Sequence, residues 1–134
     1  DMYGCHVVPP NDDGADLGSY NTQAHWITHS DGLFLVYTRR GASNDNVFRH
    51  RAPLFMAQID PEKLVVRRAT ERELVPNKGA QLGNFAIVDV NEHETWATTS
   101  EGMAPGDPSK FGSNGRVYAA RIIWEKPNRD WNRH

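Results

Sequence analysis

The sequence predicts an all-β fold made of antiparallel four-stranded meanders. Short runs rich in β-branched and aromatic residues alternate with clusters of Gly, Pro, Asn and Asp, which is typical of successive hairpins. The pattern also repeats: Leu17–Tyr20 resembles Leu82–Phe85 after 65 residues, and Pro53–Ile59 resembles Arg116–Ile122 after 63 residues. Regularly repeated meanders indicate about two blades of a six- or seven-bladed β-propeller. An open β-sandwich is the structural alternative.

The first blade is expected at residues 17–76. Two strands joined across the turn His29–Gly32 are followed by a long polar loop, a third strand that begins with a proline, and a more polar outer strand. These strands are predicted at Tyr20–Thr28, Leu33–Arg39, Pro53–Ile59 and Leu64–Val75. A helix is the alternative over residues 64–74, where Arg, Glu, Leu and Ala dominate.

An incomplete second blade is expected at residues 80–125, with strands at Phe85–Val90, Thr95–Ser100 and Arg116–Trp124. Residues 1–16 are interpreted as the end of a preceding blade, with a short strand within Met2–Val8. Residues 126–134 are expected to fray as a tail. Because two blades do not close a ring, we expect them to pack against missing blades of a longer protein or against copies of this chain.

Composition limits the classes of partner. The chain has 134 residues, 38% hydrophobic and 24% charged, which is typical of one globular domain. Fifteen basic and seventeen acidic side chains give a net charge of −2, so neither nucleic acid nor a membrane surface is an expected partner. No run approaches the length of a membrane span. The single cysteine, Cys5, excludes an internal disulfide bond.

The polar loop before Ala52 carries the strongest functional signal. Four arginines and a histidine lie within thirteen residues, and strands are predicted at both ends of the loop: Arg39, Arg40, Arg49, His50 and Arg51. A loop held at both ends by a sheet positions its side chains well, and guanidinium groups bind carboxylates through paired hydrogen bonds. The loop therefore predicts recognition of an anion.

Arg51-Ala52-Pro53 resembles the Arg-x-Pro motif that opens a strand in the sialidase (neuraminidase) superfamily. The wider run, over roughly residues 15–125, is similar to bacterial sialidase-like propeller proteins with BNR repeats. The resemblance implies that Arg51 binds a substrate carboxylate, and that the longer protein is a secreted or periplasmic glycoside hydrolase of exo-sialidase type. The Asp box of that superfamily is absent, since Asn91–Trp96 keeps only its Thr-Trp ending.

An acidic oligosaccharide is therefore the expected partner, with Arg51, Arg49, Arg39 and Asn46 as substrate-binding candidates. His50 is a candidate general base or proton donor. Glu101 aligns with Arg39 when the two hairpins are overlaid, so it should face the same opening and is the second catalytic candidate. Hydrolysis, elimination on a uronic-acid glycan by a polysaccharide lyase, and non-catalytic binding of a glycan or protein are alternatives.

No cofactor and no metal site are expected. His25 and His29 would lie on one face of a strand but about 13 Å apart, which is too far to share an ion. Trp26, Trp96 and Trp124 are expected to pack between blades, and a tryptophan at the rim has sugar stacking as its alternative role.

Overall fold

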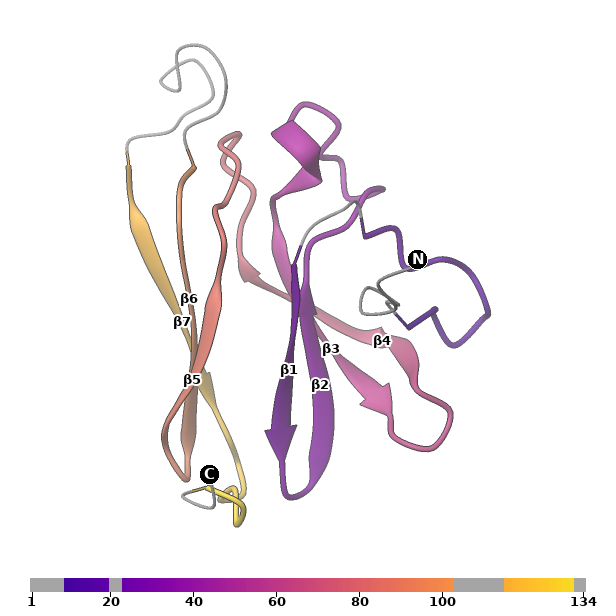
Figure 1. The fold of residues 1–134 in the computed structure, drawn as a ribbon, viewed down its shortest axis with the longest axis vertical. Helices are drawn as coiled ribbons and strands as arrows, with labels where there is room; N and C mark the ends of the chain where they lie inside the picture. Colours follow the sequence, from indigo (N-terminus) through magenta and orange to yellow (C-terminus); the bar gives the residue numbers. More distant parts are fainter. Residues whose placement is uncertain (1–8, 20–22, 103–114, 132–134) are drawn as a thin grey trace, which may run out of the picture.

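The structure, a computed structural model, describes residues 9–19, 23–102 and 115–131, which form two antiparallel sheets (Figure 1). In the first sheet the strand order is β1-β2-β3-β4, and in the second it is β5-β6-β7. The strands are β1 (Ala24–His29), β2 (Gly32–Tyr37), β3 (Leu54–Asp60), β4 (Val65–Val75), β5 (Ala86–Asn91), β6 (Glu94–Ser100) and β7 (Val117–Ile123). The prediction of an all-β fold with antiparallel meanders is confirmed.

The register of the β1–β2 hairpin is set by the short turn that connects its two strands. Trp26 pairs with Leu35 and Ile27 with Phe34 across the β1–β2 hairpin. The helix alternative for residues 64–74 is wrong: β4 pairs with β3 through Val66 and Ile59, with two irregularities in the ladder. Val66 and Ile59 are both fully buried, so tertiary burial outweighs the helix propensity of the surrounding residues.

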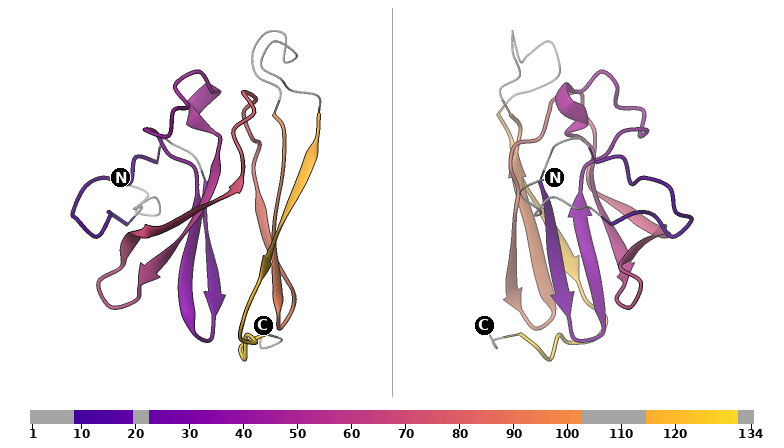
Figure 2. Two further views of the ribbon diagram at one scale, coloured as in Figure 1. Left: turned by 180° about the vertical axis from the view of Figure 1, so that it is seen from behind. Right: turned by 45° about the vertical axis from the view of Figure 1, so that its right-hand side comes forward.

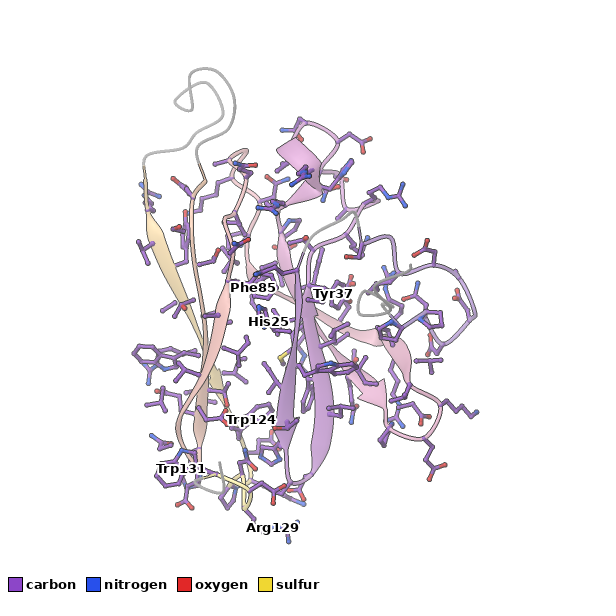
Figure 3. The ribbon with its side chains drawn as sticks, in the orientation of Figure 1. His25, Tyr37, Phe85, Trp124, Arg129 and Trp131 are labelled. Atoms are coloured by element: carbon purple, nitrogen blue, oxygen red, sulfur yellow. The ribbon has the colours of Figure 1, made fainter. Side chains whose placement is uncertain are left out.

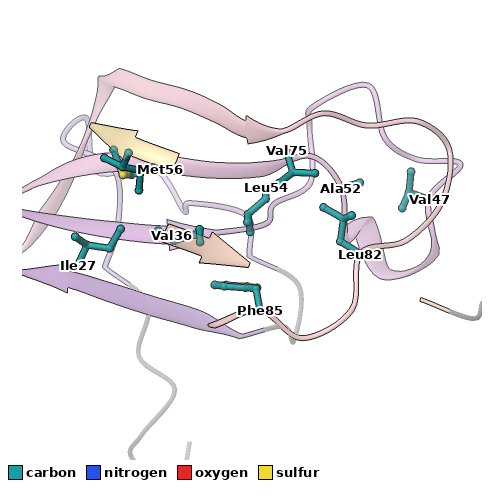
Figure 4. Packing of buried hydrophobic residues seen from close by; sticks show 11 residues of the cluster. Ile27, Val36, Val47, Ala52, Leu54, Met56, Val75, Leu82 and Phe85 are labelled. Carbon is teal, nitrogen blue, oxygen red and sulfur yellow. The ribbon is translucent and has the colours of Figure 1, made fainter. Parts of the chain in front are cut away.

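The main hydrophobic core lies between the two sheets, which stand side by side in the left-hand view of Figure 2. The first sheet contributes Ile27, Val36 and Met56, while Phe85 and Ile122 come from the second sheet and the segment leading into it (Figure 4). Trp124 packs on the edge of this core and contacts Phe34, with ring centroids 5.2 Å apart. Each sheet therefore depends on the other for burial of one face.

The outer face of the first sheet is covered in part by residues 9–19. Leu17 joins a second buried cluster with Leu35, Tyr37 and Phe55. The backbone of this segment adds to the edge of β4, where Val66 donates to the carbonyl of Pro10 at 2.8 Å. The strand predicted within Met2–Val8 lies outside the described residues, as does Cys5.

The expectation that the C-terminal tail frays is wrong for residues 126–131. Asn128 is buried, and its Oδ1 accepts the backbone N–H of Ser30 at 3.0 Å while its Nδ2 donates to the carbonyl of Thr28 at 3.2 Å. Its own N–H donates to the carbonyl of Glu92 at 2.6 Å. The side chain of Asn128 thus fastens the tail to the turn of the first sheet and its backbone N–H to the turn of the second, which a composition-based prediction of fraying cannot detect.

The two sheets repeat the same strand order. β5, β6 and β7 occupy in the second sheet the places that β1, β2 and β3 occupy in the first, as the sequence repeat predicts. The described parts of the chain contain no closed barrel. Within them, no helix is long and apolar enough to cross a membrane.

Candidate functional site

The arginine-rich loop between β2 and β3 is closed by a buried asparagine. Asn44 is fully buried, and its Nδ2 donates to the carbonyl oxygens of Arg39 and Ala52, both at 2.7 Å. One amide therefore bridges the two ends of the loop. A turn, in which Val47 donates to the carbonyl of Asn44 at 3.0 Å, and a short 3-10-type turn at Phe48–His50, in which Arg49 departs from helical geometry, complete the loop. The loop is thus held by its own polar contacts.

The last residues of the loop have an unusual backbone. Arg49 and His50 have φ values of 55° and 54°, in the left-handed region that non-glycine residues rarely adopt. Such a conformation costs about 1 kcal/mol or more per residue and is retained where the surroundings enforce it. The following residue, Arg51, is held by its carbonyl, which accepts the N–H of Leu82 at 2.8 Å. The strained turn therefore ends in a residue bound to the segment that leads into the second sheet.

Arg51 presents a cation that forms no ion pair with the acidic residues that the structure describes. Its guanidinium is partly buried, and its Nε is fully buried with no hydrogen-bond partner among the residues that the structure describes. Burial, and then the positive charge of Arg49, lower the pKa of Arg51. No ion pair joins Arg51 to an acidic residue within the described ranges. Such an arrangement favours binding of an external anion.

The hollow beside Arg51 is small. Its volume is about 10 Å³, which is room for a single polar group, and it is lined by Gln23, Thr38 and residues 82–85. Another buried polar atom without a partner, Oε1 of Gln81, lies in the same segment. Among the described residues that line the hollow, Arg51 is the only ionisable one.

Arg39 is not part of this site, because its charge is neutralised on the outer side of the first sheet. Its Nη2 donates to Oε1 of Glu71 at 2.7 Å and its Nε to Oε2 of Glu71 at 2.9 Å. The hydroxyl of Tyr37 donates to the same Oε2 at 2.5 Å, and the guanidinium lies 4.7 Å from the ring centroid of Phe55. The side chains of Arg39 and Glu71 are 12% and 11% exposed. Arg39 is thus held in a structural ion pair.

Sequence reasoning missed this Tyr37–Arg39–Glu71 network. Burial acts to raise the pKa of Glu71, but hydrogen bonds from Arg39 and Tyr37, with the nearby charges, outweigh it and lower that pKa. Burial, followed by the hydrogen bond to Glu71, raises the pKa of Tyr37. The sequence of β4 mixes arginines and glutamates, but this pattern does not show that the side chain of Glu71 points toward Tyr37 of β2.

The remaining loop candidates are Asn46, Arg49 and His50. Asn46 and Arg49 are exposed. The Nε2 of His50 lies 3.5 Å from Oδ1 of Asp45, whose side chain is 96% exposed. His50 is partly buried and does not line the hollow beside Arg51. Of the loop candidates, Arg51 lines the hollow, and Asn46, Arg49 and His50 do not.

Glu101 lies at the same end of the two sheets as Arg51. Leu82 connects them, because its N–H donates to the carbonyl of Arg51 and it forms an isolated bridge with Glu101. Glu101 is buried; its Oε1 accepts the hydroxyl of Tyr118 at 3.0 Å, and its Oε2 accepts the N–H of Arg116 at 3.3 Å. Burial, and then Glu101, raise the pKa of Tyr118. The carboxylate of Glu101 therefore contacts β7 and the residue before it.

Within the described residues, no cluster of three or more His, Cys, Asp or Glu side chains is arranged to hold a metal ion. The two histidines of β1 make packing contacts: His25 stacks edge-on against Phe85 at 4.9 Å, and His29 lies 4.6 Å from Trp124.

A cleft of about 450 Å³ opens between β3, β4 and β7, but no buried polar atom without a partner lies among its lining residues.

Comparison of the chain with protein-family models, curated proteins and solved structures found no match.

Proposed function

We propose that the chain recognises an acidic glycan by binding one of its carboxylates to Arg51. The observation that supports this proposal is the guanidinium of Arg51, which is partly buried and lacks a countercharge among the described residues. A desolvated cation of this kind is stabilised when an anion supplies the missing charge. A planar guanidinium matches a carboxylate through two parallel hydrogen bonds.

The size of the hollow specifies what enters it. A volume of about 10 Å³ accepts a carboxylate oxygen but no sugar ring, so the ring remains outside, on the surface formed by Asn84 and its neighbours. Asn84 is exposed, and its amide is available to a ring hydroxyl at this position. Recognition at Arg51 therefore selects the charged group of the glycan rather than its ring stereochemistry.

Of the three alternatives, the geometry favours binding of the glycan without hydrolysis or elimination. Hydrolysis and elimination both need a second acid or base beside the bound group, and the described residues that line the hollow supply none. Glu101 is committed to Tyr118 and Arg116, and His50 lies outside the hollow. Glycoside hydrolysis or a lyase reaction that uses His50 and Glu101 stays a prediction, which an activity assay of the same chain on the same glycans tests.

The chain is proposed to be two successive blades of a sialidase-like β-propeller. Three features support this: the meanders repeat in the same strand order, the sheets pack face to face, and the arginine-rich loop lies at the same end as Glu101. In such an arrangement the loops at one end surround a common opening. Small-angle scattering of this chain joined to the further blades that the proposal requires tests whether a closed propeller forms, because a closed propeller is compact and an open array of sheets is extended.

The binding proposal is tested by calorimetric titration with galacturonic acid and with sialic acid, and with galactose as the neutral control. We expect both acids to bind and galactose not to bind. Arg51→Ala should weaken binding about 10- to 100-fold, which corresponds to loss of a charge-assisted hydrogen-bond pair. Arg51→Lys should be intermediate, since it keeps the charge but loses the planar pair of donors.

Arg72→Ala is the matched control, because Arg72 is an exposed arginine of β4 that lines the cleft away from Arg51. Its affinity should equal that of the wild type. Equal affinity of Arg51→Ala and wild type for both acids would refute the role of Arg51, and tight binding of galactose would refute recognition of the carboxylate.

A further inference from the structure

The second sheet has one face toward the first sheet and an outer face turned away from it. Ile87, Ala97 and Ala120 belong to or pack against the main core, so alternation along each strand turns the residues between them outward. Figure 3 shows Phe85 and Trp124 between the two sheets, on the side opposite to this outer face. The strand pairing sets the outward residues in rows: Ala86, Thr98 and Ala119; Val88, Trp96 and Arg121; Glu94 and Ile123; Ser100 and Val117.

Aliphatic side chains are exposed across the outer face of the second sheet. Val117 is 77% exposed, Ile123 is 61% exposed and Val88 is 50% exposed. Ala119 lies between them and is also exposed, and Trp96 at the centre of the face is half-buried. Neighbouring exposed apolar side chains on one face mark a surface that another apolar surface covers.

The sequence repeat relates this outer face to the face of the first sheet that forms the main core. Pro53–Ile59 recurs as Arg116–Ile122, so Leu54 and Met56 correspond to Val117 and Ala119. Leu54 and Met56 are buried in the main core, between the two sheets. The second sheet therefore leaves exposed the face by which the first sheet packs onto its neighbour.

The polar groups on the outer face already bond to one another. Glu94 accepts the indole N–H of Trp96 at 2.7 Å through Oε2, and it accepts Nε–H of Arg121 at 3.0 Å through Oε1. The charge of Arg121 is thus neutralised within the face, although its side chain is 63% exposed. Covering this face leaves no unpaired charge behind, which keeps the cost of removing it from water small.

The partner that fits this face is the same face of a second copy. In each copy, residues 9–19 cover part of the outer face of the first sheet, where Leu17 packs with Leu35 and Tyr37. That face is therefore not free to receive another sheet. The outer face of the second sheet remains, and two identical faces pack against each other about a two-fold axis.

We infer that two copies of the chain associate through the outer faces of their second sheets. The three strands of this sheet are 6, 6 or 7, and 7 residues long at most, which gives a face of roughly 15 Å by 20 Å, about 300 Å². A standard interface buries about 800 Å² per partner, so the dimer should be weak, with a Kd on the order of 100 µM. In a closed ring the next sheet would cover the same face, so the dimer is expected of this chain alone.

The test is sedimentation velocity of the chain from about 10 µM to about 1 mM, a range that brackets the expected Kd. The wild type should change from monomer to dimer over this range. Val88→Ser combined with Val117→Ser should raise the Kd about 10-fold or more, because two aliphatic side chains leave the interface. Leu64→Ser is the matched control, since Leu64 is 53% exposed and precedes β4 of the first sheet, and it should dimerise like the wild type.

A second measurement does not depend on the variants folding. In ¹H–¹⁵N spectra of the wild type, dilution should shift the amide signals of Thr98 and Ala119 and leave that of Leu33 in place. A monomer at every concentration, or a double variant that dimerises like the wild type, would overturn the inference. Growth beyond the dimer, or a shift at Leu33, would indicate head-to-tail packing onto the first sheet and would overturn the two-fold arrangement. Arg51→Ala should dimerise normally, so the dimer and the proposed function are tested separately.

Discussion

Replacement of Glu71 by glutamine tests whether the Tyr37–Arg39–Glu71 network stabilises the fold. The substitution keeps the shape of the side chain, removes the charge, and turns one acceptor of Arg39 into a donor. Glu71 accepts two hydrogen bonds from Arg39 and one from Tyr37, and it lies 3.4 Å from Nε of Arg68. Because both members of the ion pair are about nine-tenths buried, Arg39 would be left as a desolvated cation.

The expected loss is about 3 kcal/mol, at the lower end of the range for breaking a buried ion pair, because the pair keeps some contact with solvent. With a urea m-value of about 1.5–2 kcal/mol/M, the unfolding midpoint should fall by about 1.5–2 M. Glu73→Gln is the matched control, since Glu73 is an exposed glutamate on the same strand, and its midpoint should change little. The assay is urea unfolding followed by circular dichroism.

The pH dependence gives a second, independent expectation. The pKa of Glu71 is lowered in the folded chain, so its stabilising contribution is present above the ordinary value of about 4.3 and is lost as pH falls through the folded value. The difference between wild type and Glu71→Gln should therefore shrink as pH falls from 6 toward and below that folded value. A difference under about 0.5 kcal/mol at pH 7, or no coupling to Arg39→Met in a double-mutant cycle, would contradict the reasoning.

Three further predictions concern buried hydrogen bonds. Asn44→Ala leaves the carbonyls at both ends of the arginine-rich loop without their donor and should destabilise the chain by about 2–3 kcal/mol in urea unfolding. Tyr37→Phe removes the donor to Glu71 and should lower stability by about 1–2 kcal/mol. It should also reduce the loss of stability expected above about pH 10, where the raised pKa of Tyr37 makes the folded state bind more protons than the unfolded one. Asn128→Ala should speed amide exchange at Ser30; unchanged exchange would show that Asn128 does not fasten the tail.

The strands and their order could be predicted from local sequence. Their alternation of apolar residues and the turn residues between them act over a few positions, so the hairpin across Asn91–Glu94 and the strands β1 to β7 follow from the pattern. The repeat was also visible, because two independent similarities shared nearly one interval. The tail was mispredicted, since Asn128 is fixed by partners about 100 positions away in the sequence.

The candidate site was only partly predictable. The resemblance and the position of Arg51 just before β3 predicted that its side chain binds a carboxylate. In the structure, the Nε of Arg51 is buried and has no hydrogen-bond partner among the described residues. The sequence also predicted Arg39 as a substrate-binding residue. In the structure, Arg39 instead binds Glu71, which lies 32 positions away in the sequence and is brought near by the pairing of β2, β3 and β4. Trp26 shows the same limit, because the local sequence does not reveal that this large apolar residue, paired with Leu35 across the hairpin, is 49% exposed.

The sequence by itself determined that this chain forms repeated antiparallel meanders with an arginine-rich loop between two strands, because strand periodicity and turn chemistry are local properties. Only the tertiary structure decided that Arg39 forms an ion pair with Glu71, that Arg51 forms none with the described acidic residues, and that Trp26 and Trp131 are exposed. Those outcomes depend on contacts between residues far apart in the chain, and the register of β4 and the packing of the two sheets set these contacts.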